Sequence, residues 1–171
     1  MSLFGPLSGS VFTDDATVGT IAWTSTANVA VRDKTYANAA MNVGDVSHYL
    51  LATGFGFAIP TQVTVIGVVA ELLRTGTTNQ LIVDSSIRLV VGGVVVGNER
   101  AVPTDQWASL TQRYRRYGGA VDLWGVPWLL SADVSATGFG IAVSATDTFD
   151  EGFGATAQLD HIQMTVYGAG M

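Results

Sequence analysis

The sequence contains two histidines that could act as a catalytic base. It contains no cysteine, so a thiol nucleophile is excluded. His48 directly follows Ser47, and neighbours in sequence cannot form the hydrogen bond of a catalytic serine and histidine without special geometry. His161 follows Asp160, where a surface pair is favoured over a catalytic dyad. We therefore interpret both histidines as structural.

Acidic residues offer a second route to chemistry. Asp147, Asp150 and Glu151 share one turn-prone segment, but their spacing is not that of a D-x-[DN]-x-[DN]-G calcium loop, so a solvated acidic turn is favoured over a metal site. Asp122 and Asp133 flank the segment LWGVPWLL, and a glycoside-cleaving pair would depend on a separation that the sequence does not give. The sequence thus predicts no catalytic residue, metal or cofactor, and a protein that is not an enzyme.

A near-repeat, TGFGFAIP at residues 53–60 and TGFGIAVS at residues 137–144, raises the question of a phosphate-binding loop. Neither G-x-G-x-x-G nor G-x-x-x-x-G-K-[ST] occurs, and no helix is expected to follow either copy. Each octet instead alternates bulky and small residues, which predicts a strand with a core face and a bare face that lets backbone approach closely. The bulky residues are Phe55, Phe57 and Ile59 in the first copy and Phe139, Ile141 and Val143 in the second.

One short segment, TQRYRRYGG, concentrates cationic and aromatic side chains. Three of the eight basic residues of the chain lie within four positions there. Arginine and tyrosine are enriched at protein interfaces, so the cluster fits a contact surface and a solvated basic turn equally well. As a contact surface it would meet an acidic partner or the Asp-rich loop of a neighbouring subunit. The residues are Arg113, Tyr114, Arg115, Arg116 and Tyr117.

Composition favours a single domain whose surface is partly covered by other chains. The 171 residues are 48% hydrophobic and only 13% charged, which is a low charge content for a monomer. The net charge of −6 argues against binding of nucleic acid, which needs a broad basic surface. No run reaches the ~18 apolar residues of a membrane helix, and the N-terminus lacks the pattern of a secretory signal, so no membrane association is expected.

Glycines and β-branched residues predict an all-β chain of short antiparallel strands. Gly92-Gly93 between two valine-rich runs predicts a hairpin with strands at about 86–91 and 94–99. Residues 61–74 are apolar on both faces, which predicts a central strand. Ile162, Met164 and Val166 alternate with polar residues in the last strand, so His161 is expected to face solvent or a partner. The segment DQWASLTQRYRRYGG fits a helix or an extended crossover, and we favour the crossover.

Residues 1–18 show scattered apolar side chains without a period, and this predicts an extended arm that is ordered only on a neighbouring molecule. Residues 19–171 would then form a single β-sandwich domain. The apolar residues of the arm that we expect at an interface are Leu3, Phe4, Leu7 and Phe12.

The order of several segments resembles a group of β-sandwich structural proteins of tailed phages and prophages. Trp23, Ala30, Asp33, Tyr36 and Ala37 begin this order, and YLLATGFGFAIP, VTVIGVVAEL, YGGAVDLWGVPW, DVSATGFGIAVS and AQLDHIQMTVYG continue it. The resemblance covers about residues 20–168 and not the N-terminal arm. It implies a jelly-roll-like sandwich that serves as a head decoration or cement protein on the outer surface of the virion, with the major capsid protein or another virion protein as partner and no catalytic residues.

Three functions therefore stand as expectations. The first is a non-enzymatic virion protein that binds the head lattice through its arm and an oligomeric interface, with a trimer expected at local threefold positions by analogy. The second is a carbohydrate- or receptor-binding module that presents tryptophans on a sheet face, unless these belong to the core. The third, a hydrolase that uses Asp122, Asp133 or Asp147, comes last. The tryptophans concerned are Trp107, Trp124 and Trp128.

Overall fold

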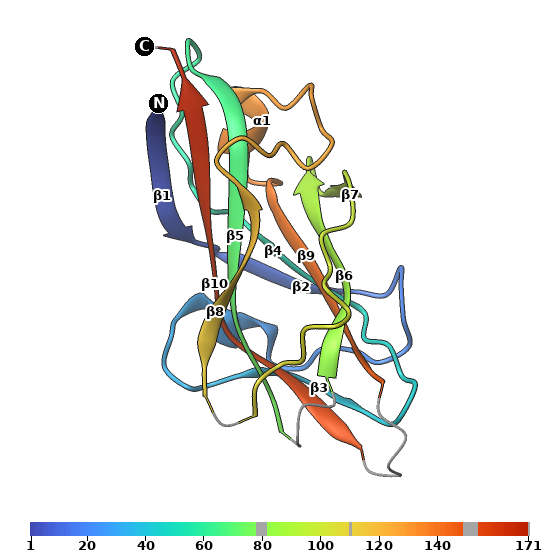
Figure 1. Ribbon diagram of the computed structural model, residues 1–171. Helices are drawn as coiled ribbons and strands as arrows, with labels where there is room; N and C mark the ends of the chain where they lie inside the picture. The colour runs from blue at the N-terminus through green and yellow to red at the C-terminus, as the bar shows by residue number, and fades with distance from the viewer. Residues whose placement is uncertain (78–81, 110, 149–153, 171) are drawn as a thin grey trace.

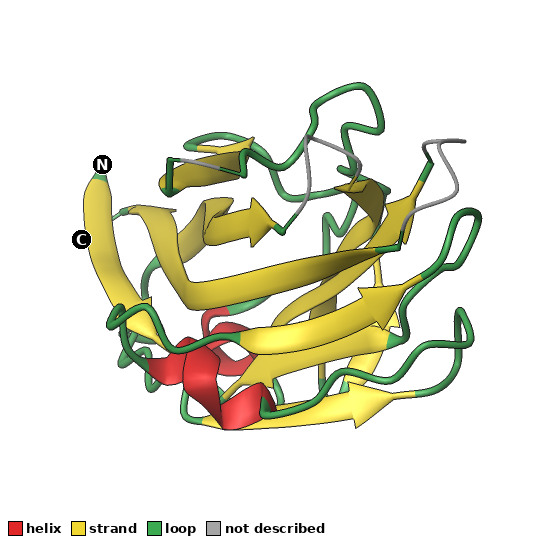
Figure 2. Ribbon diagram, turned by 90° about the horizontal axis from the view of Figure 1, so that it is seen from below, coloured by secondary structure: helices red, strands yellow, loops and turns green. Residues whose placement is uncertain are grey.

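Two antiparallel sheets pack face to face in the computed structural model, which describes residues 1–77, 82–109, 111–148 and 154–170 (Figures 1 and 2). The first sheet has the order β1 (Ser2–Ser8), β10 (Ala155–Ala169), β5 (Thr64–Gly76) and β8 (Arg113–Gly119), and β3 (Ala37–Met41) also pairs with β10. The second sheet has the order β2 (Val11–Asp15), β4 (Tyr49–Thr53), β9 (Gly140–Asp147), β6 (Ile82–Val91) and β7 (Val94–Val96). The predicted all-β, antiparallel sandwich is confirmed.

The strand pairing is nested in the manner of a jelly roll. The innermost pair is the β6–β7 hairpin, and the pairs β5–β8, β4–β9 and β1–β10 enclose it in turn. Successive pairs alternate between the two sheets, so the chain wraps around one interior. Strands β2 and β3 add to the edges of this scheme.

Hydrophobic patterning explains why the strands lie where they do. Strand β5 is paired on both edges and buried along nearly its whole length, as its two apolar faces predicted. The hairpin turn falls at Gly92-Gly93, with Val91 opposite Val94, although β7 ends at Val96 and not at about residue 99. The extended interpretation of residues 105–119 is confirmed by β8 over 113–119.

The two similar octets fold differently. Most of the second octet belongs to β9, and Phe139, Ile141 and Val143 are completely buried. A Cβ at Gly140 would overlap the carbonyl of Ala52 on the neighbouring strand β4. Residues 54–60 form no strand, which corrects the prediction for the first octet. Gly54 and Gly56 have φ values of 68° and 71°, and such left-handed residues interrupt a ladder.

The N-terminal segment belongs to the sandwich, which corrects the prediction of a separate arm over residues 1–18. Strand β1 pairs with β10 from Ser2 opposite Gly168 to Ser8 opposite Gln163, and β2 pairs with β4. Phe4 and Phe12 pack against the core. The segment is ordered by its own chain because it completes one edge of each sheet (Figure 1).

In the part of the chain that the structure describes, helical structure is confined to two short elements, η1 (Thr26–Ala30) and α1 (Ser131–Ser135). Within the described residues no helix has the length and apolar character needed to cross a membrane.

Candidate functional site

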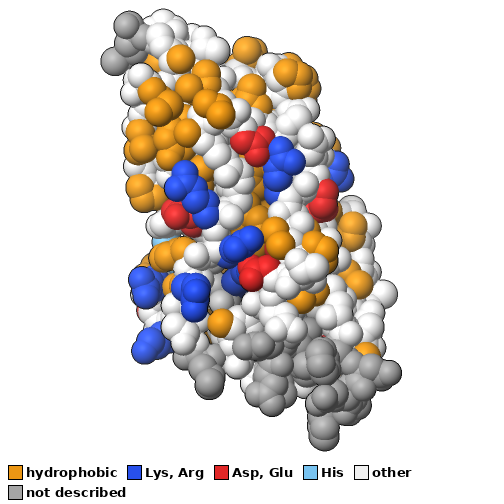
Figure 3. Space-filling model, viewed as in Figure 1, with side chains coloured by type: hydrophobic (Ala, Val, Ile, Leu, Met, Phe, Trp, Pro, Cys, Tyr) orange, Lys and Arg blue, Asp and Glu red, His pale blue; other side chains and the backbone are white. Residues whose placement is uncertain are grey.

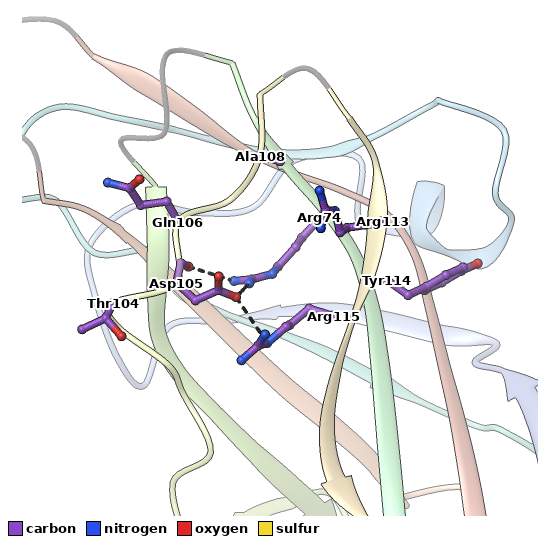
Figure 4. A pocket seen from close by; sticks show the side chains of 8 residues that line it. All are labelled: Arg74, Thr104, Asp105, Gln106, Ala108, Arg113, Tyr114 and Arg115. Carbon is purple, nitrogen blue, oxygen red and sulfur yellow. Dashed lines mark hydrogen bonds and ion pairs between the residues drawn. The ribbon is translucent and has the colours of Figure 1, made fainter.

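A polar pocket of about 410 Å³ lies between strand β8 and the loop that precedes it (Figure 4). It sits toward one end of the sandwich, where the apolar interior gives way to charged side chains. Its lining residues are Arg74, Thr104, Asp105, Gln106, Ala108, Arg113, Tyr114 and Arg115.

The alternation of β5 places an arginine at the floor of this pocket. Ala70 and Leu72 point into the core, and Arg74 is the next residue on the same face. Arg74 is only 5% exposed, so its charge must be compensated inside the protein. Its guanidinium lies 5.4 Å from the ring centre of Trp107 and 6.0 Å from that of Tyr117. The arginine is thus held between aromatic faces and carboxylates.

Asp84 of β6 supplies the buried counter-charge. Arg74 Nη1 donates to Asp84 Oδ1 at 2.6 Å, and Trp107 Nε1 donates to the same oxygen at 2.8 Å. The second oxygen accepts hydrogen bonds from Tyr117 OH at 2.8 Å and from Val102 N at 3.0 Å. Burial, together with the charge of Asp84, raises the pKa of Tyr117, so its hydroxyl stays a donor. This carboxylate joins both sheets and the intervening loop.

Asp105 connects the buried network to the pocket. Its carboxylate is ion-paired with Arg74 Nη2, and its Oδ2 lies 3.2 Å from Arg115 Nε. Figure 4 shows Arg74 and Arg115 reaching toward Asp105 from adjacent strands. Arg113 lies directly opposite Arg74 in the pairing of β5 with β8, and within the described residues it makes no hydrogen bond or ion pair. The pocket therefore carries uncompensated positive charge.

The two carboxylates at the pocket are engaged by donors. Asp84 is saturated by four donors, and Asp105 is held by two guanidinium groups, so neither carboxyl is free to act as a general acid or base. Among the residues that the structure places, no cluster of three histidine, cysteine or acidic side chains could hold a metal ion. What remains is a set of cationic donors facing a solvent-accessible hollow, which is suited to an anionic group.

The predicted arginine–tyrosine cluster is divided by the alternation of β8. Arg113 and Arg115 line the pocket, and Tyr117, on the same side, is buried in the core. Arg116 lies on the opposite face, where its Nη2 donates to Tyr167 OH at 3.3 Å. Tyr114 is half-buried. The cluster thus forms two distinct surfaces and not one.

The predicted interface residues near the N-terminus are divided in the same way. Leu3 and Leu7 are 57% and 36% exposed on β1. Phe4 and Phe12 pack against the interior of their own chain, so they are not free to contact a partner. Strand alternation separates Leu3 from Phe4, whereas Leu7 follows a register shift in β1 and lies opposite the core residue Met164.

His161 is buried at 7% exposure, which corrects the expectation that it faces solvent or a partner. Its Nε2 lies 2.8 Å from Ser8 Oγ of β1 and its Nδ1 lies 2.7 Å from Tyr114 OH of β8, so flanking strands cover it. Neither of these bonds involves Asp160. A bulge in β10 falls at Asp160, whose Oδ1 accepts the backbone N–H groups of Asp33 and Lys34. The Asp160–His161 pair is thus not a dyad.

Protonation of His161 should weaken the fold. Burial lowers the pKa of His161 below its ordinary value of 6.5, Asp160 partly opposes this, and Arg32 adds to it. The unfolded chain therefore takes up the proton first, and the stability present above about pH 6.5 is lost as the pH falls toward the folded-state pKa. Melting temperatures of the wild type should decline more steeply between about pH 6.5 and pH 5 than those of His161→Gln. Parallel curves for the two proteins would contradict this.

The remaining candidate residues have structural roles. His48 Nδ1 lies 2.8 Å from Asp14 Oδ2, whereas the Ser47 hydroxyl donates to the backbone oxygen of His48. Asp122 pairs with Arg100, and Asp133 accepts the backbone N–H of Leu130 at the start of α1. Asp147 is buried, and Asp150 and Glu151 lie outside the described residues.

The tryptophans fall into two groups. Trp107 and Trp124 are fully buried, so they belong to the core. Trp128 is 55% exposed and lies near Leu130, which is 64% exposed. A ligand-facing role is therefore open to Trp128 and closed to the other two.

Sequence reasoning missed Arg74, Asp84 and Asp105, which form the centre of the site. A signal was present, because Arg74 continues the core face of Ala70 and Leu72 in VVAELLRTG, and Asp84 is the one charge in the apolar segment LIVDSSI. A lone charge at a core position of a strand must be paired or neutralised.

Comparisons with known proteins leave the chain without a family. No protein-family model and no curated protein matches it. Among solved structures it matches an arabinose-bound MgGH51 α-L-arabinofuranosidase with a TM-score of 0.47 and 11% sequence identity. The match covers 96% of this chain and 26% of that one, so this chain spans about a quarter of the length of the arabinofuranosidase.

Proposed function

We propose that this protein is a non-enzymatic structural component of a tailed-phage virion, and that it decorates or cements the head by binding the capsid lattice from outside. The resemblance of residues 20–168 to phage structural sandwiches motivates the proposal. The chemistry of the pocket supports the non-enzymatic part, because its carboxylates are occupied by arginines.

The observation that carries the proposal is the exposure of three apolar side chains on the two N-terminal strands. Leu3, Leu7 and Val11 are 57%, 36% and 49% exposed there, on strands at the edges of the two sheets. Figure 3 shows hydrophobic side chains gathered at the end of the molecule where β1 begins and β10 ends. Large apolar side chains exposed on edge strands are candidates for contact with a partner. In this proposal the N-terminal segment attaches as an ordered surface and not as a free arm.

The second element of the proposal is self-association. The low charge content of 13% suits a chain whose surface is shared with neighbours. A trimer would match the threefold positions of a head lattice, and most homo-oligomers have closed symmetry.

Leu3→Ser together with Leu7→Ser should abolish attachment to empty heads of the phage whose genome carries this gene. Each leucine would lose burial worth about 1.5–3 kcal/mol at an interface, so the affinity for heads should fall by about 100-fold or more. Cosedimentation with the heads measures this. Val31→Ser, at a residue 61% exposed elsewhere, is the matched control and should leave occupancy unchanged. Full occupancy by the double variant, with its melting temperature unaltered, would overturn the proposed surface.

A carbohydrate- or receptor-binding module is the second candidate, and the exposure of Trp128 favours it. An exposed tryptophan provides a platform on which a sugar ring can stack. Binding to a glycan array that is lost in Trp128→Ala, combined with no binding to heads, would favour this candidate over the first.

A further inference from the structure

Basic side chains are concentrated around one segment of this acidic protein. Three of them, Arg74, Arg113 and Arg115, line the pocket beside β8. Arg32 and Lys34 line a neighbouring pocket of about 430 Å³ that shares the same segment, since Ala108 and Arg113 border the first pocket and Ser109 and Gln112 the second. Five of the eight basic residues thus serve two adjoining hollows in a chain of net charge −6. Figure 3 shows Lys and Arg side chains gathered across the middle and lower part of this face.

Strand β8, which borders the first pocket, is the edge of its sheet. It pairs with β5 on one side, and no described strand pairs with its other side. An edge strand presents unpaired backbone N–H and C=O groups that can accept a further strand. At about 3.3 Å per residue, the seven residues of β8 offer an edge about 23 Å long.

The arginines beside this edge retain free donors. Arg113 has no partner within the described residues, and Arg115 is engaged through Nε alone, with Asp105. Arg115 Nε is shielded from solvent and makes no hydrogen bond in the geometric sense, although it lies within ion-pair distance of Asp105. Because guanidinium groups bind carboxylates through two parallel N–H bonds, Arg113 and Arg115 have the capacity for one carboxylate each.

We propose that β8 receives an extended acidic segment of a partner protein, which adds to the sheet as a further strand and places two carboxylates on Arg113 and Arg115. The two arginines are two residues apart on the same face, so the carboxylates of the incoming strand must also be two residues apart, in an acid-x-acid pattern. The backbone of β8 supplies pairing, and the arginines select the charge and the register. This deepens the attachment role proposed above and rests on it for the identity of the partner.

The distribution of charge favours an acidic peptide over nucleic acid. A polyanion needs a broad basic track, whereas the basic residues here border two hollows on a protein of net charge −6. Two carboxylates at fixed spacing fit the donors that remain free on the guanidinium groups of Arg113 and Arg115.

Arginines on an edge strand also have a simpler explanation, because charged side chains protect exposed edges from unwanted pairing. The two explanations differ in outcome. Protection predicts that no strand-forming peptide binds at β8. Recognition predicts that an acidic strand binds and that the position of its acids matters.

The test uses the full chain and a fluorescent seven-residue peptide of valine and threonine with glutamate at its third and fifth positions. We expect binding by fluorescence anisotropy, and we expect Arg113→Glu to weaken it by about 10-fold or more. Arg113 makes no contact that the fold needs, so this variant should keep its melting temperature. Arg116→Glu, on the same strand but the opposite face, is the matched control and should change the affinity by less than about 3-fold.

A second peptide of the same composition, with glutamate at its third and fourth positions, tests the register. It should bind about 10-fold more weakly, because only one of its carboxylates can reach the pocket face. Equal affinity for both peptides, equal losses in Arg113→Glu and Arg116→Glu, or no binding would each overturn the proposal. Attachment to heads that depends on Leu3 and Leu7 without peptide binding would reject this inference alone, and the reverse result would reject the proposed function alone.

Discussion

Asp84→Asn should lower the free energy of unfolding by about 3–5 kcal/mol, the cost of breaking a buried ion pair by removing one partner. Asparagine has nearly the same shape as aspartate, but its side-chain NH2 group would face groups that are themselves hydrogen-bond donors. Tyr117 OH and Val102 N would lose their acceptor, and Arg74 would keep only Asp105 as a counter-charge. Chemical denaturation followed by tryptophan fluorescence measures the loss, because Trp107 donates to the same carboxylate.

Asp122→Asn is the matched control for this experiment. Asp122 also pairs with an arginine, Arg100, but the two side chains are 30% and 29% exposed, so solvent screens the pair. Its removal should cost about 1 kcal/mol or less. If Asp84→Asn were no more harmful than Asp122→Asn, the assignment of Asp84 as the joint between the sheets would be wrong.

Deletion of residues 1–17 should destabilise the sandwich by several kcal/mol and expose it to aggregation. The deletion removes β1 and β2, which leaves the edges of β10 and β4 unpaired. It also removes Phe4 and Phe12 from the core. Size-exclusion chromatography and thermal unfolding of the truncated chain measure the effect.

Leu3→Ser together with Leu7→Ser separates this structural role from attachment. The double variant keeps the backbone of β1 and both phenylalanines, so its melting temperature should stay close to that of the wild type. A truncated chain that unfolds like the full one would show instead that residues 1–17 are a dispensable arm, as the sequence alone predicted.

Local pattern explains which strands were predictable. The β6–β7 hairpin was identifiable because positive φ at Gly92 and Gly93 is a local requirement that glycine meets. Strand β5 was identifiable because burial of both faces leaves a continuous apolar run. The first octet shows the limit of pattern: Phe55, Phe57 and Ile59 are buried as the alternation required, yet no ladder forms there. Burial can alternate in an irregular segment that packs on a core.

The sequence by itself determined the all-β class, the central strand, the hairpin and most of the core, because each depends on the side-chain period within a few residues of chain. Only the tertiary structure decided the rest. Ser2 pairs with Gly168, at the other end of the chain. Arg74, Asp84 and Asp105 come from three separate segments and form ion pairs in the folded protein. No local sequence pattern specifies contacts between residues so far apart in the chain. From its sequence the segment TQRYRRYGG forms one cluster, and only its place in β8 at the edge of the sheet put Arg113 and Arg115 at a pocket and Arg116 on the opposite face.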